Sequence, residues 1–243
     1  MNSLSIKNPQ WNLKDIFIIL VIINVFGLSY GAFFGEPLQS LIVRILPVIP
    51  DDYITYFFIA SVIQTTLFVG LSIVFAVWIY GGRLSDLGIN LSNFGSNIIW
   101  GVTGGITLLA LVMGTGALIS HFFAVEAEPQ PFAELLFEID STGGLIIPFI
   151  MAVVLAPIGE EVFFRGFVYP VFRRMWSLPV AMIVSGILFA SLHFDLIRAI
   201  PLAVGGIGLA WLYEKTGSIV TPIIAHAVWN GIMTIMLFTT LQM

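Results

Sequence analysis

Long uncharged stretches alternate with short charged ones along this chain, and this pattern predicts its helices. A helix needs about 20 apolar residues to cross the hydrocarbon core of a bilayer. The pattern therefore predicts an all-α fold: a polytopic membrane helical bundle of about seven transmembrane helices. The uncharged runs are 16–35, 53–82, 87–125, 141–159 continuing to 166, 175–194, 199–213 and 216–243.

The basic residues between these runs predict the orientation of the bundle. Loops on the cytoplasmic side of a membrane are enriched in Lys and Arg. Because most of the basic residues fall on one side, the N-terminus is expected in the cytoplasm and the C-terminus outside. The first run has no small-residue cleavage site and is expected to stay as a span. The residues on the cytoplasmic side are Lys7, Lys14, Arg83, Arg173, Arg174 and Lys215, against Arg44 and Arg198.

An acidic segment, residues 126–140, separates the third and fourth runs. It holds five acidic residues and no Lys or Arg, and its apolar residues recur at helical spacing after Pro131. This pattern is typical of a helix that lies on the membrane surface, here on the outer side. We therefore divide the chain into N-terminal transmembrane helices with this segment, residues 1–140, and a catalytic core of the last four helices, residues 141–243.

Composition narrows the class of protein. The 243 residues are 58% hydrophobic and 9% charged, whereas a soluble domain is about 25% charged. These values predict an integral membrane protein, with the lipid bilayer as its surroundings. A net charge of −5 argues against a nucleic-acid partner. The chain has no cysteine, which excludes disulfides, thiolate catalysis and cysteine metal ligands.

Three charged residues interrupt the fourth apolar run, at Glu160, Glu161 and Arg165. A charge inside a bilayer costs about 3 kcal/mol or more, so such residues indicate a function or a partner. Glu161 and Arg165 are four residues apart, with the acid first, and this order favours an ion pair on one helix face. We expect that pair to support the structure. Glu160 points about 100° away along the helix and needs another partner.

Further polar residues follow at His193, His226 and Asn230. His226 and Asn230 are four apart, so both project from one helix face. If the fourth helix turns at residues 177–179, an antiparallel hairpin brings Glu160 and His193 to one depth. The pattern therefore predicts that Glu160, His193, His226 and Asn230 line one cavity.

Two kinds of chemistry fit these four residues. A carboxylate and a histidine can activate a water molecule, while an amide and a second imidazole stabilise the developing oxyanion. Glu160, His193 and His226 could instead hold a divalent metal such as zinc, with an open position for water. The HExxH motif is absent. We favour activation of water without a cofactor, and the metal remains an alternative.

The motifs carry a resemblance to a known family. Three segments resemble the EExxxR, FxxxH and HxxxN motifs of the CPBP family: residues 156–166 (APIGEEVFFRG), 189–193 (FASLH) and 226–230 (HAVWN). This family includes the type II CAAX prenyl endopeptidases and the ABI group of bacteriocin-processing and self-immunity proteins. The resemblance implies an intramembrane protease. It implies that Glu160 is the general base, that His193 orients the water, and that His226 and Asn230 bind the oxyanion.

The resemblance also implies a peptide or lipidated-peptide substrate in the membrane and a place in a bacterial plasma membrane. It leaves the metal dependence and the substrate open. One alternative is a non-catalytic membrane immunity or scaffold protein of the same fold. A proton-coupled transporter is disfavoured, because the sequence shows no inverted repeat.

Overall fold

The structure is a computed structural model, and it describes residues 8–47, 52–123, 131–137, 139 and 142–241. Every regular element among these residues is a helix, so the predicted all-α fold is confirmed. The N-terminal half contains α1 (Leu13–Ser29), the π-helical η1 (Tyr30–Phe34), α2 (Gly35–Ile45), α3 (Tyr53–Ile73), the π-helical η2 (Val74–Ile79), the 3₁₀ turn η3 (Leu84–Leu87), α4 (Phe94–Phe123) and α5 (Pro131–Phe137).

The C-terminal half begins with one long, nearly continuous helix. It contains the 3₁₀ turn η4 (Thr142–Leu145), α6 (Ile146–Ile150), the π-helical η5 (Met151–Leu155), α7 (Ala156–Glu161), the π-helical η6 (Val162–Val168) and α8 (Tyr169–Met175). Three further helices follow: α9 (Leu178–Ser191), α10 (Ala199–Thr216) and α11 (Val220–Leu241).

Five helical runs in the described part of the chain are long and apolar enough to cross a membrane. They confirm a polytopic integral membrane protein. The remaining two predicted spans are shorter helices: α9 has 14 residues and α10 has 18. At 1.5 Å per residue α9 is about 21 Å long, which is less than the ~30 Å hydrocarbon core. Of the hairpin of α9 and α10, α9 is therefore too short to cross the hydrocarbon core alone, whereas α10 is about 27 Å long. The five runs are Leu13–Ile45, Tyr53–Ile79, Phe94–Phe123, Ile146–Met175 and Val220–Thr240.

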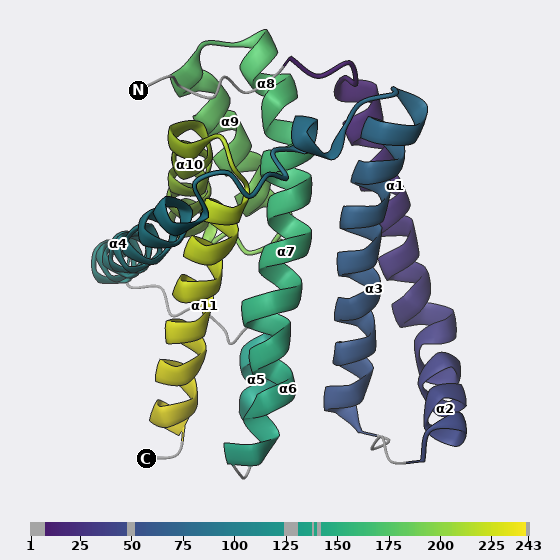
Figure 1. The fold of residues 1–243 in the computed structure, drawn as a ribbon. Helices are drawn as coiled ribbons and strands as arrows, with labels where there is room; N and C mark the ends of the chain where they lie inside the picture. The colour runs from purple at the N-terminus through teal and green to yellow at the C-terminus, as the bar shows by residue number, and fades with distance from the viewer. Residues whose placement is uncertain (1–7, 48–51, 124–130, 138, 140–141, 242–243) are drawn as a thin grey trace.

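The long helix that contains α7 stands in the middle of the bundle. Figure 1 shows α1 and α3 on one side of it and α4, α10 and α11 on the other. Glycines allow the close approach of α4 and α11 in this second group. A Cβ atom on Gly101 would lie 2.6 Å from the Ile224 side chain, and one on Gly105 would lie 2.5 Å from the Ala225 carbonyl oxygen. These small residues let the backbones of α4 and α11 pack tightly.

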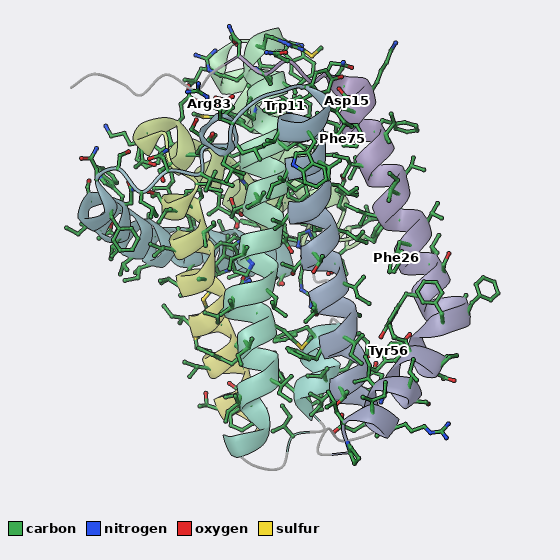
Figure 2. All side chains as sticks on the ribbon, turned by 45° about the vertical axis from the view of Figure 1, so that its right-hand side comes forward. Trp11, Asp15, Phe26, Tyr56, Phe75 and Arg83 are labelled. Atoms are coloured by element: carbon green, nitrogen blue, oxygen red, sulfur yellow. The ribbon has the colours of Figure 1, made fainter. Side chains whose placement is uncertain are left out.

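The residues before α1 fix the central helix from the N-terminal side. Trp11 is almost fully buried, its ring stacks on Phe167 at 5.0 Å, and its Nε1 donates to the Phe167 carbonyl oxygen at 2.7 Å. Phe75 packs edge-on against the same phenylalanine, and Figure 2 shows Trp11 and Phe75 near one another. The N-terminal helices thus hold η6, where Arg165 lies, in a fixed place.

The acidic segment is described only in part. The predicted helix is present at α5, where Leu135 and Leu136 are buried. Leu136 and Ile139 pack with Phe238 at the end of α11. Residues 124–130, 138 and 140–141 lie outside the described residues, and most of the segment's acids are among them. The position of the segment on the outer surface and the division of the chain at residue 140 stay predictions.

Candidate active site

Two prolines shape the helix that carries the glutamates. Pro157 and Pro170 have no N–H, so each removes one hydrogen bond of the helix. A π-helical segment, η5 or η6, directly precedes the α-helical stretch in which each proline is the second residue. Such segments are often found at functional sites. Here they bracket α7, so Glu160 and Glu161 lie on a short α-helical stretch between two irregular ones.

The predicted ion pair between Glu161 and Arg165 is present and fully buried. Arg165 Nη1 donates to Glu161 Oε1 at 3.0 Å, and both side chains have 0% exposure. Arg165 Nη2 donates to the Gly206 carbonyl oxygen at 2.9 Å, which ties η6 to α10. The guanidinium also lies over the ring of Phe189, 4.8 Å from its centre. Arg165 therefore holds together three helices around Glu161.

Glu161 has a second partner that the sequence pattern did not predict. His226 Nδ1 lies 2.9 Å from Glu161 Oε1, although the two residues are 65 positions apart. An ionised carboxylate can only accept hydrogen bonds, so Nδ1 carries the hydrogen. This bond fixes the imidazole ring and points its other nitrogen, Nε2, away from Glu161. Glu161 is thus a positioning residue for His226 as well as the partner of Arg165.

The free nitrogen of His226 faces Glu160. His226 Nε2 lies 4.0 Å from Glu160 Oε2, and the Glu160 side chain is 18% exposed. Glu160 Oε2 has no hydrogen-bond partner among the described residues. Two polar atoms at this separation can both contact one water molecule placed beside them. Glu160 and His226 therefore form a polar pair with room for a shared water molecule, and Glu160 is the more exposed of the two side chains.

His193 lies at the end of α9 and is exposed. Its Nδ1 is 2.8 Å from the Phe189 carbonyl oxygen, and its ring packs against the Phe189 ring with the ring centres 4.8 Å apart. The Phe189 ring also contacts the His226 ring, at 5.9 Å. Phe189 therefore links the two imidazoles. The structure brings Glu160 and His226 together, whereas the contacts of His193 are with Phe189.

Asn230 lies on α11, one turn beyond His226, as predicted. Its Nδ2 donates to the carbonyl oxygen of Ala152 at 2.9 Å. In a π-helical segment the carbonyl of residue i bonds the N–H of residue i+5. That residue is Pro157, which has no N–H, so the Ala152 carbonyl needs another donor. Asn230 supplies it, and the second hydrogen of the same amide nitrogen remains for a ligand.

The side chains do not form a three-ligand metal site in this arrangement. Within the described residues, no group of three or more His, Asp and Glu side chains is placed to hold a metal ion. Glu160 and His226 approach one another, but His193 is not gathered with them. We therefore derive no chemical step through a metal, and the candidate set Glu160, His193 and His226 stays an alternative for experiment.

Sequence reasoning missed the contacts that join different helices. The hydrogen bonds from His226 to Glu161 and from Arg165 to Gly206 were not predicted. The Arg165–Gly206 contact had a weak signal in the sequence, because the adjacent glycines 205 and 206 leave the α10 backbone accessible to a neighbouring side chain. The His226–Glu161 contact had none, because a motif of short spacing cannot reveal a partner 65 residues away.

Comparison with known proteins bears on the same region. Residues 142–232 match the family model "Type II CAAX prenyl endopeptidase Rce1-like". A protein of Bacillus subtilis (strain 168), named "Putative membrane peptidase YdiL", is 26% identical over 144 residues, which cover 59% of this chain and 58% of that protein. An "Uncharacterized 24.3 kDa protein" of Escherichia coli is 27% identical over 114 residues, which cover 45% of this chain and 52% of that protein.

The chain thus spans little more than half the length of these two relatives. No solved structure matches it. The family match begins at η4 and ends within α11, and it includes all four candidate residues. The resemblance that the three sequence motifs indicated is therefore confirmed: residues 142–232 are similar to the type II CAAX prenyl endopeptidases of the Rce1-like family.

Proposed function

We propose that this protein is an intramembrane peptidase. It hydrolyses a peptide bond in a membrane-associated or lipidated peptide, without a covalent intermediate. Glu160 takes a proton from a water molecule, the resulting hydroxide attacks the peptide carbonyl carbon, and the protonated Glu160 then donates that proton to the leaving amine. Asn230 donates a hydrogen bond to the oxyanion that forms, and His226 does the same from Nε2 in its doubly protonated form, while its Nδ1–H stays bonded to Glu161. His193, at the edge of the site, helps to orient the water.

One observation carries this proposal: Glu160 Oε2 lies beside an imidazole that a buried network holds in place. The network consists of Arg165, Glu161 and His226, joined by bonds of 3.0 and 2.9 Å. If charged groups inside a membrane protein served only to stabilise the fold, we would expect them to be paired with one another. Glu161 and Arg165 are paired in this way and fully buried, although Glu161 Oε2 and Glu160 Oε2 both lack a hydrogen-bond partner among the described residues. Glu160 differs because its side chain is 18% exposed and only approaches His226, with Oε2 4.0 Å from Nε2. A partly exposed carboxylate without a close partner in an apolar helix supports a chemical role.

The comparisons support the same reaction class. The matching family is described as an endopeptidase family, and the Bacillus relative is named as a membrane peptidase. Both relatives come from bacteria, which supports a bacterial plasma membrane as the location. The bias of basic residues supports a cytoplasmic N-terminus.

The test compares Glu160→Gln with Glu36→Gln, the same substitution at an exposed glutamate of α2. Cells that express each variant at equal levels are analysed for new peptide N-termini in the membrane fraction. We expect cleavage products with the wild type and Glu36→Gln, and none with Glu160→Gln, because Gln cannot take the proton. Thermal unfolding of the purified proteins should be the same.

The opposite result distinguishes a second function. If Glu160→Gln yields the same cleavage products as the wild type, Glu160 is not the base and the proposal is wrong. If no variant yields products but the wild type and Glu160→Gln show the same biological effect, the non-catalytic immunity or scaffold function is correct.

A further inference from the structure

A large apolar cavity lies on the far side of α10 from the candidate active site. It has a volume of about 630 Å³ and is bordered by α4, α9 and α10. Cavities of this size hold a ligand of drug-like dimensions. On α10, the Gly206 carbonyl bonds Arg165 of the active-site network, while Val204, Ile207 and Trp211 line the cavity. The cavity is therefore separate from the proposed catalytic residues.

The threonine hydroxyls in the lining are not free to orient a polar ligand. Thr103 and Thr107 line the cavity from α4, but their hydroxyls donate to carbonyl oxygens of the same helix, those of Ile99 and Thr103, at 2.7 and 2.8 Å. Each threonine therefore has its hydroxyl already engaged. The rest of the lining is apolar or aromatic apart from two glycines. An apolar chain fits this surface, and a polar ligand would lose its hydrogen bonds to water there.

One end of the cavity carries an aromatic pair and a cation. Trp100 and Trp211 meet edge to face at 6.1 Å, and both line the cavity. Lys215, one turn after Trp211, places its Nζ 5.6 Å from the centre of the Trp100 ring. Tryptophans are enriched at the level of lipid headgroups. Lys215 also belongs to the basic residues on the predicted cytoplasmic side, where the membrane surface is negative.

The length of the cavity matches the length of one acyl chain. From Trp100 to Leu111 the lining of α4 covers 11 residue steps, or about 16 Å at 1.5 Å per residue. One acyl chain spans half of a ~30 Å hydrocarbon core, or about 15 Å. A lipid with its headgroup at Lys215 would thus place one acyl chain along the whole cavity.

We propose that the cavity between α4 and α10 binds one anionic phospholipid, with an acyl chain against Thr103, Thr107 and Leu111 and the phosphate at Lys215. The bound lipid fills space between helices that also support the active site, because α10 carries Gly206. This site does not depend on the proposed peptidase activity. It can therefore be tested without a substrate.

The experiment uses the full chain in phosphatidylcholine vesicles that contain a trace of a lipid with a photoreactive acyl chain. The lipid is phosphatidylglycerol in one sample and phosphatidylcholine in the other. After irradiation, the labelled peptides are mapped. We expect phosphatidylglycerol to label residues 100–111 and 204–212 more strongly than it labels the lipid-facing sides of α1 and α3.

Two pairs of variants test the chain and the headgroup separately. Thr107→Phe fills the cavity and should reduce labelling there to the level of the other helices, whereas Ile106→Phe, on an exposed position outside the lining, should not. Lys215→Gln should lower the preference for phosphatidylglycerol by about fivefold, the equivalent of ~1 kcal/mol for one lysine near an anionic surface. Lys215→Arg should keep that preference.

The proposal is overturned if labelling is spread evenly over the helices, if both lipids label the cavity equally, or if Thr107→Phe behaves like Ile106→Phe. If Thr107→Phe lowers the thermal stability, Leu111→Trp replaces it as the filling variant.

Discussion

Glu160 and Glu161 are neighbours in sequence and lie in opposite surroundings. Glu161 is fully buried and bonded to Arg165, four residues later on the same long helix, and to His226 on α11. Each glutamate has one oxygen without a hydrogen-bond partner among the described residues, but Glu160 is partly exposed and its nearest polar partner, His226 Nε2, is 4.0 Å away. The different surroundings indicate different roles for the two glutamates, which the EExxxR motif alone does not distinguish. Glu161 holds the architecture in place, and Glu160 is left free to react.

The division extends to the residues around them. Arg165 and Gly206 continue the buried network, whereas His193 and Asn230 lie at its more open edge. His226 belongs to both regions, since one nitrogen bonds Glu161 and the other faces Glu160. We therefore expect substitutions in the network to act on stability and substitutions at the edge to act on turnover.

The largest effect on stability is expected from Arg165→Ala. Removing one partner of a buried ion pair costs about 3–5 kcal/mol, because the other charge remains buried and unpaired. The variant should express poorly or unfold at a lower temperature, which thermal unfolding in detergent would measure. Arg173→Ala is the matched control: Arg173 pairs with Glu214 at 2.9 Å but is 36% exposed, and such pairs contribute only about 0–1 kcal/mol. A stable Arg165→Ala protein with slow turnover would contradict this division.

Asn230→Ala tests the edge of the site. Loss of one donor to an oxyanion lowers kcat by about 10²–10³-fold. Asn230 also caps the Ala152 carbonyl, so the alanine variant should lose some stability as well. Asn230→Asp removes the N–H donors and keeps the shape, which separates the oxyanion role from simple loss of volume. Turnover of a peptide identified from the mapped N-termini is the measurement, and unchanged kcat in both variants would exclude the oxyanion role.

His193→Ala should have the smallest effect of the residues named by the motifs, because His193 is exposed and its contacts are with Phe189. The same variant tests the metal alternative. We expect elemental analysis of active, purified wild type to find no stoichiometric zinc. Zinc that is present in the wild type and lost in His193→Ala would instead make Glu160, His193 and His226 metal ligands and would displace the proposed mechanism.

Much of the fold followed from local sequence. The lengths of apolar runs gave the long helices, and the hairpin turn before α9 occurs where Ser177 and Pro179 predicted it. The Glu161–Arg165 pair followed from a spacing of four residues on one helix. The shortness of α9 as a span was less clear, because an uncharged run does not reveal where a helix ends inside it.

The sequence by itself determined that this is a helical membrane protein with charged residues inside an apolar run. Burying a charge in lipid is costly, so charged residues are rare in such runs and the few that occur are easily recognised. It also determined which residues resemble a known family. Only the tertiary structure decided which glutamate is engaged and which is free. That outcome depends on α11 bringing His226 to Glu161 across 65 residues, and on Pro157 leaving a carbonyl that Asn230 must satisfy. Contacts between distant helices depend on how those helices pack, and no short spacing in the sequence encodes them.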